Sequence, residues 1–164
     1  SLDRRQRQMC IRDSSRILPF GNFLRKTKIN ELPQLINILK GDMSIIGPRP
    51  QTKRCFDAFP RRSQEKIISV RPGLSGIGSI IFRDEEEMMS SEKDANDLYD
   101  NTIMPFKGEL EEWFVDNRNA YIYFLLILIT IWSVVFKNSN IVWKMLQNLP
   151  EPPQRLEYWI KRTV

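Results

Sequence analysis

The sequence of 164 residues contains no histidine. This absence excludes serine and cysteine triads and His-ligated zinc or haem, and it leaves acid–base chemistry to carboxylates, lysine or tyrosine. The two cysteines, Cys10 and Cys55, are far apart and form no C-x-x-C motif, so neither a zinc cluster nor a disulfide framework is indicated. We therefore expect a protein of a reducing, cytoplasm-facing compartment.

A large excess of one charge is also missing from most of the chain. The net charge is +5, but residues 1–16 alone hold five Arg against two Asp, so the remainder is nearly balanced. The charge is therefore weak support for nucleic-acid binding. The length fits one domain with a modest core and one site.

Three segments are expected along the chain. Residues 1–12 show no apolar period, and we expect them to be a non-native or disordered leader. We also expect the true N-terminus of the protein to be missing from the sequence. Residues 13–150 form the domain itself. Residues 151–164 form a C-terminal tail, in which a proline-rich stretch leads into a short basic and aromatic segment that could lie on a lipid headgroup surface.

The segment from Glu31 to Lys40 has the pattern of an amphipathic helix. Its apolar residues recur at i, i+3, i+4 and i+7, as Leu32, Leu35, Ile36 and Leu39. Asn30 is a suitable N-cap, and Gly41 is suitable for the position that follows the last helical residue. The pattern predicts one helix with one apolar face.

The next segments predict short elements. Residues 44–50, SIIGPRP, predict an extended run that ends in a stiff turn. Residues 53–70 predict a short amphipathic helix that is interrupted or begins near Pro60. Residues 71–82, RPGLSGIGSIIF, place three glycines before a β-branched and aromatic run, which predicts a loop leading into a strand or hairpin. The expected fold class is α+β, predominantly helical with a short strand or hairpin.

Two later segments differ sharply in polarity. Residues 84–100 hold eight acidic residues and one Lys, which favours a solvated helix face or loop over a metal site. Residues 120–136 are 17 uncharged, mostly apolar residues, at the lower limit for spanning a bilayer. A chain this short has little interior in which to bury such a helix on all sides, so we expect membrane contact here.

A cluster of charges before and after the first helix could hold a phosphate. Arg25 and two lysines precede the helix N-terminus, and Glu31 lies in its first turn. Arg49, between two prolines, carries a guanidinium on a rigid stem that suits bidentate phosphate contact. The alternative is a capped surface helix whose Glu31 pairs with a lysine. The glycines after Arg71 do not have the dinucleotide-binding order and are interpreted as turn residues.

Two strings carry a resemblance to a known family. The run FGNFLRKTKINELPQLINILKGDMSIIGPRP, followed by RPGLSG, resembles the bacterial sugar transferases, which are monotopic phosphoglycosyl transferases. The resemblance implies a membrane-associated single domain on the cytoplasmic face of the bacterial inner membrane. It also implies transfer of a sugar phosphate from a UDP-sugar to polyprenyl (undecaprenyl) phosphate, with Mg²⁺, at the start of surface polysaccharide or glycolipid assembly.

The resemblance assigns roles to individual residues. Asn30 and Glu31 match the catalytic Asp-Glu pair of the family, in which Asp is the nucleophile and Glu its acid–base neighbour. Glu31 is also the implied metal ligand, and Arg25, Arg49 and Arg71 are the implied ligands of substrate phosphates. A carboxylate at a helix N-terminus beside cations suits attack on a phosphate.

The sequence departs from the family pattern in three places. Asn30 replaces the nucleophilic Asp, and an amide is a far poorer nucleophile. The N-terminal hydrophobic anchor helix is missing from the sequence, as expected for an N-terminally truncated member. Tyr123 and Leu125 stand where the late helix usually has Asp and Lys.

Three functions therefore compete. The first is a phosphoglycosyl transferase that tolerates Asn30. The second is a non-catalytic, membrane-bound relative that acts as a binding or assembly subunit. The third, a nucleic-acid module, is disfavoured because the helix from Glu31 to Lys40 offers no basic stripe.

Overall fold

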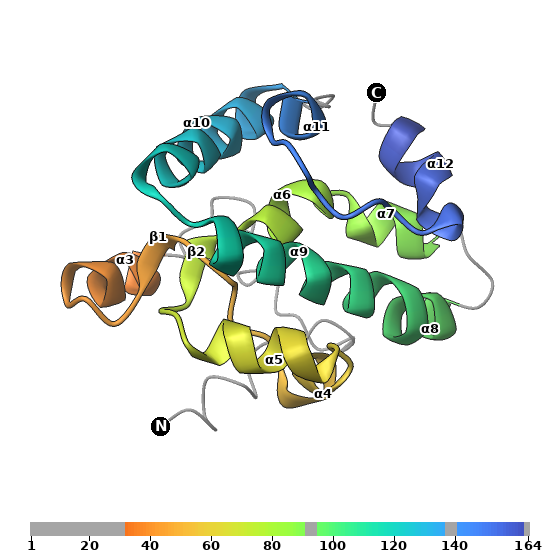
Figure 1. Cartoon of the computed structure of the whole chain (residues 1–164), viewed down its shortest axis with the longest axis horizontal. Coiled ribbons are helices and arrows are strands. Elements are labelled where there is room, and N and C mark those ends of the chain that lie inside the picture. Colours follow the sequence, from red (N-terminus) through yellow and green to blue (C-terminus); the bar gives the residue numbers. More distant parts are fainter. Residues whose placement is uncertain (1–31, 91–94, 137–140, 163–164) are drawn as a thin grey trace, which may run out of the picture.

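The computed structural model describes residues 32–90, 95–136 and 141–162, which are mostly helical (Figure 1). The first half contains α3 (Leu32–Leu39), β1 (Ser44–Ile46), α4 (Lys53–Asp57), α5 (Arg61–Ile68), β2 (Gly73–Ser75), α6 (Ile77–Ile81) and α7 (Glu85–Ser90). The second half contains α8 (Ala95–Leu98), the π-helical turn η3 (Tyr99–Ile103), α9 (Met104–Asn117), α10 (Ala120–Val135), α11 (Ile141–Met145) and α12 (Gln154–Arg162). The predicted fold class, α+β with predominant helix, is confirmed.

The two strands pair in parallel, with Ser44 opposite Gly73 and Ile46 opposite Ser75. The hairpin alternative is therefore wrong for this pair, because α4 and α5 form the crossover that joins the strands. The predicted extended run at residues 44–50 is confirmed in β1, and the predicted break near Pro60 separates α4 from α5.

The run after the third glycine forms a helix, so the predicted strand there is wrong. Residues 77–81 form α6, with Gly76 in extended conformation before its first turn. Ile77 and Phe82 are buried, and the Phe82 ring packs edge-on against Phe106 of α9 at 6.1 Å between centroids. The helix places Ile77 in the core and is followed directly by Phe82, which also reaches the core, and this burial outweighs the strand preference of β-branched residues.

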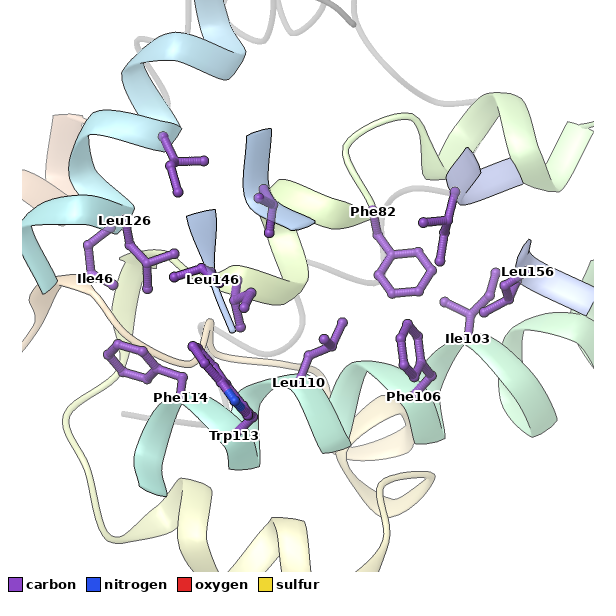
Figure 2. Close-up of a cluster of buried hydrophobic side chains, with 14 of the residues drawn as sticks. Ile46, Phe82, Ile103, Phe106, Leu110, Trp113, Phe114, Leu126, Leu146 and Leu156 are labelled. Atoms are coloured by element: carbon purple, nitrogen blue, oxygen red, sulfur yellow. The ribbon is translucent and has the colours of Figure 1, made fainter. Parts of the chain in front are cut away.

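The core lies around α9, which runs through the middle of the molecule (Figure 1). Figure 2 shows its side chains meeting those of α6, α10 and the C-terminal segment. Leu156 and Ile160 of α12 belong to this core. The C-terminal tail is predicted from its sequence to lie on lipid headgroups, but the apolar side of its helix α12 packs into the protein core. On the opposite side of α9, Glu112 binds Arg62 and Lys66 of α5 at 2.7 and 2.9 Å.

The apolar face of α3 is exposed. Leu35, Ile36 and Leu39 have exposed fractions of 44, 54 and 87%. The helix and its C-terminal glycine are as predicted, with Gly41 at a φ of +79°. The described residues do not cover this apolar face. An exposed group of three large apolar side chains indicates that something outside the described residues contacts it.

The apolar segment 120–136 forms α10, whose N-terminus is capped by Asn119 through a 2.9 Å bond from the Ile122 N–H. Leu125, Leu126 and Ile129 are buried in the core, whereas the opposite face is exposed. Within the described part of the chain, no helix has both the length and the apolar character needed to cross a membrane.

Candidate functional site

The two motifs that carry the family resemblance are in direct backbone contact. Directly after β1, the backbone at Gly47 lies against the backbone at Gly73 of β2, and we call this contact the crossing. A Cβ added at Gly73 would lie only 2.2 Å from the Gly47 nitrogen. The Gly47 N–H donates to the Ser75 carbonyl and the Gly73 N–H donates to the Pro48 carbonyl, both at 2.9 Å. Both glycines are therefore required by the close approach of two backbones. The crossing fixes the position of the turn that carries Arg49.

A buried carboxyl group lies behind this turn. Glu111 of α9 is 4% exposed, and its Oε1 accepts the Gly78 N–H at 3.2 Å. Its Oε2 has no hydrogen-bond partner among the described residues. A Cβ at Gly78 would lie 2.8 Å from Oε1, and one at Gly76 would lie 3.0 Å from it. The glycines of the RPGLSGIG stretch thus make room both for the crossing chain and for this carboxyl group.

Burial raises the pKa of Glu111 to about 8, although the Gly78 N–H, Lys107 and Arg49 each act in the opposite direction. Glu111 therefore lies within electrostatic reach of Arg49. Sequence reasoning missed this residue. The sequence signal for it is a glutamate that lies between Leu110 and the aromatic residues Trp113 and Phe114, which indicates a carboxyl group on a largely apolar helix.

The acidic stretch also contributes a buried residue. Glu85 of α7 binds Lys107 at 2.7 Å, and both side chains are about nine-tenths buried. The Lys107 ammonium group lies 5.3 Å from the centre of the Phe82 ring. The prediction of a solvated face is wrong for Glu85, because Lys107 compensates its charge in the interior.

A pocket of about 500 Å³ lies between β1, the end of α9 and the start of α10. Arg71, which precedes β2, lines it, and its Nη1 lies 3.9 Å from the position that a Cβ of Gly41 would take. Arg71 is thus at the C-terminal end of α3. On the pocket wall, the Tyr123 hydroxyl lies 3.0 Å from Ser44 Oγ and accepts the Ile45 N–H at 3.2 Å.

The remaining predicted site residues, Arg25, Asn30 and Glu31, lie outside the described residues. Of the predicted phosphate ligands, Arg49 is half-buried at the crossing and Arg71 is exposed at the pocket. Within residues 32–90, 95–136 and 141–162, no group of three or more acidic or cysteine side chains could hold a metal ion. The described residues therefore supply no Mg²⁺ cage of their own.

The raised pKa of Glu111 makes stability depend on pH. The folded state retains a proton that the unfolded state releases above the ordinary pKa of Glu, so folding stability should fall as pH rises from about 4.5 to about 8. Glu111→Gln keeps the acceptor for the Gly78 N–H and removes the titrating group. We expect this variant to gain stability relative to the native protein between pH 5 and pH 8, measured by urea unfolding. A constant difference across this range would contradict the buried, protonated state.

A family model for bacterial sugar transferases matches residues 2–137, and the chain belongs to that family. The match extends into residues 1–12, which lie before the motifs that carry the resemblance. Lys107, Glu111, Arg118 and Tyr123 all lie within the matched range. The described site is therefore part of the family domain.

Named relatives extend this finding. The chain is 32% identical over 123 residues to the uncharacterized sugar transferase EpsL of Bacillus subtilis, covering 75% of this chain and 52% of that protein. It is 28% identical over 135 residues to the undecaprenyl-phosphate galactose phosphotransferase of Salmonella typhimurium, covering 80% and 22%. It is 41% identical over 71 residues to the UDP-glucose:undecaprenyl-phosphate glucose-1-phosphate transferase of Caulobacter vibrioides, covering 42% and 27%. The chain thus spans about half or less of the length of these relatives.

Proposed function

We propose that this chain is a phosphoglycosyl transferase that moves a sugar 1-phosphate from a UDP-sugar to polyprenyl (undecaprenyl) phosphate. The transfer starts surface polysaccharide or glycolipid assembly. The observation that carries the proposal is the backbone contact at Gly47 and Gly73, which joins the two family motifs into one unit around Arg49. The names of the Salmonella and Caulobacter relatives support the acceptor and the type of transfer. Release of UMP from a UDP-sugar tests the proposal.

In the proposed reaction the phosphoanhydride bond of the donor breaks, and the bridging oxygen leaves with UMP. The phosphorus of the sugar phosphate forms a new phosphoanhydride bond to an oxygen of the acceptor phosphate. Arg49 binds donor phosphate, because the flanking prolines restrict the backbone of its turn and Glu111 lies within electrostatic reach of it. Glu31 acts as the acid–base group and as the protein ligand of Mg²⁺. When bound, the metal neutralises charge on the phosphates. Arg25 adds a second cation before the helix.

A second candidate is a non-catalytic, membrane-bound relative that binds substrates or assembles with other proteins. One observation favours it, namely Asn30 at the position of the family nucleophile. Such a protein would bind a UDP-sugar but release no UMP. The two candidates are therefore separated by measuring donor binding and UMP release on the same preparation.

Arg49→Lys keeps the positive charge but loses the planar fork that binds two phosphate oxygens. We expect donor binding or turnover to fall by about tenfold or more. The matched control is Arg61→Lys, because Arg61 is exposed at the start of α5 and away from the crossing. Steady-state kinetics with a UDP-sugar measure both variants. Unchanged kinetic constants for Arg49→Lys would remove Arg49 from the donor site.

We also propose that α10 places the protein on the cytoplasmic face of the bacterial inner membrane as a monotopic domain. The support is an exposed apolar stripe on α10, defined as Tyr121, Phe124, Leu128, Ile131 and Val135, each more than half exposed. Residues at spacings of three and four lie on one face of a helix. This stripe would lie in the lipid interface, parallel to the membrane plane.

The stripe predicts stable association with membranes. The expressed chain should be found in the membrane or detergent fraction, and Leu128→Asp should weaken vesicle binding because it places a charge in the stripe. Its thermal stability should change little, since Leu128 is exposed. Vesicle flotation and thermal unfolding measure the two effects. Recovery of the native chain as a monodisperse soluble monomer without detergent would contradict the proposal.

A further inference from the structure

Two exposed arginines meet at the pocket of about 500 Å³ beside α10. Arg71 lies shortly before β2, and Arg118 lies in the turn between α9 and α10, directly before the Asn119 cap. Neither arginine forms a salt bridge with another residue of the described ranges. Two guanidinium groups that face one space and have no acidic partner there are suitable ligands for an anion from outside the protein.

This pocket is separate from the proposed reaction centre. Neither Arg49 nor Glu111 lines it. Arg71 lies beside Gly41, at the C-terminal end of α3, whereas the sequence places the proposed catalytic pair before the other end of that helix. The eight residues of α3 span about 12 Å. An anion held by Arg71 and Arg118 is therefore not assigned to the reacting groups.

The pocket lies on the flank of α10, beside the stripe and not in line with it. Ala120 and Tyr123 line the pocket, whereas the stripe runs from Tyr121 to Val135. Because an α-helix turns by about 100° per residue, these two lining residues lie on average about a quarter of a turn from the centre of the stripe. When the stripe lies in lipid and the helix is parallel to the membrane plane, this flank is at the level of the lipid headgroups.

Exposed apolar side chains from three helices lie close to the two cations. Ile68 at the end of α5 is followed directly by Ser69 and Val70, which line the pocket. Leu39 ends α3 next to the turn that Arg71 approaches, and Tyr121 lies in the first turn of α10. A soluble phosphate makes no use of apolar neighbours, whereas a lipid headgroup is attached to acyl chains that contact them. The surroundings therefore favour a bilayer lipid over a free anion.

We propose that this pocket binds the phosphate of an anionic membrane phospholipid, with Arg71 and Arg118 as its cationic ligands. The inference rests on the proposed membrane placement of α10 and goes beyond it, because it names the lipid charge and the residues that select it. Binding on one flank sets the rotation of α10 about its own axis, and hence the orientation of the domain on the membrane. It assigns Arg71 to the membrane and not to a substrate phosphate.

Vesicle binding tests the inference without turnover. The full chain is titrated with vesicles of phosphatidylcholine alone and with vesicles that also contain phosphatidylglycerol. We expect at least about tenfold tighter binding to the anionic vesicles, and a loss of about fivefold in this preference for Arg118→Gln and for Arg71→Gln. The matched control Arg61→Gln removes the same charge from an exposed arginine outside the pocket. It should keep most of the preference, because salt screens attraction that does not involve direct contact.

Three results would overturn the inference. An equal loss of preference in Arg61→Gln and the two pocket variants would leave only a diffuse surface charge. Release of the bound chain by inorganic phosphate, but not by sodium chloride of the same ionic strength, would make the pocket a site for a soluble anion. Phosphatidylglycerol with a photoreactive headgroup should label residues 69–71 or 118–123, and labelling confined to other segments would place the headgroup elsewhere.

A second variant separates this inference from the proposed membrane placement. Leu128→Asp should weaken binding to both kinds of vesicle, whereas Arg118→Gln should weaken binding only to the anionic kind. Binding that depends on Leu128 but is equal for both kinds would retain the placement and contradict the pocket. An anionic preference that depends on Arg118 but not on Leu128 would retain the pocket and contradict the placement. UMP release reports on the transferase separately, because neither binding result depends on turnover.

Discussion

The Asn30→Asp variant is expected to form a covalent adduct with the mass of a sugar phosphate, whereas the native chain forms none. Asp presents a carboxylate in place of an amide of the same shape, and a carboxylate can attack the donor phosphorus directly. Asp also retains the ability to cap the helix, so the fold should survive. Intact-mass spectrometry with a UDP-sugar and Mg²⁺, in the absence of polyprenyl phosphate, measures the adduct.

Glu31→Gln provides the control for this experiment. It should abolish UMP release in the native background, because it removes the only carboxyl group of the pair without changing its shape. In the Asn30→Asp background it should also abolish UMP release, because it removes the proposed acid–base group and ligand of Mg²⁺ while the new carboxylate remains. An adduct on the native chain would show that Asn30 does not occupy the nucleophile position. Persistent UMP release from Glu31→Gln would remove Glu31 from the acid–base role.

The Gly73→Ala variant is expected to lose about 4 kcal/mol or more of unfolding free energy, or to fail to fold. The added methyl group would lie 2.2 Å from the Gly47 nitrogen and 2.4 Å from its oxygen. Both contacts are to backbone atoms, which can move only if the crossing opens. The loss of the crossing would also displace Arg49, so that donor binding should fall with stability. Urea unfolding monitored by tryptophan fluorescence measures the stability.

Two other glycines provide graded controls. Gly41→Ala has room for its methyl group but keeps a φ of +79°, so it should cost about 1–2 kcal/mol. Gly108→Ala meets side-chain atoms of Pro60 and Phe59 at 3.0 and 3.1 Å, which can shift slightly, so its cost should lie below that of Gly73→Ala. A Gly73→Ala variant as stable as Gly41→Ala would contradict the backbone crossing as the organising contact of the site.

Elements set by local chemistry could be predicted from the sequence. The helix before Gly41 follows from the spacing of its leucines and isoleucine, and its end follows from a residue that tolerates positive φ. The break at Pro60 follows from the missing N–H of proline. These signals act within a few residues, and no distant contact among the described residues overrides them.

Features set by contacts between distant segments could not be predicted. The run of residues 77–81 prefers a strand locally, yet it forms α6 because Ile77 is buried in the core. Glu111 belongs to the site only because the chain at Gly76 and Gly78 passes close to α9. The position of the Arg71 side chain, beside Gly41 and the start of α10, follows from the parallel pairing of two short strands. Such placements depend on the whole fold.

The product of the reaction tests the central claim most directly. The chain is incubated in vesicles with a UDP-sugar, Mg²⁺ and polyprenyl phosphate, and the lipid extract is analysed by mass spectrometry. We expect polyprenyl diphosphate sugar to form together with an equal amount of UMP, and more of both from Asn30→Asp. Donor and acceptor binding without this lipid product from either form would contradict the transferase and support a non-catalytic member of the family.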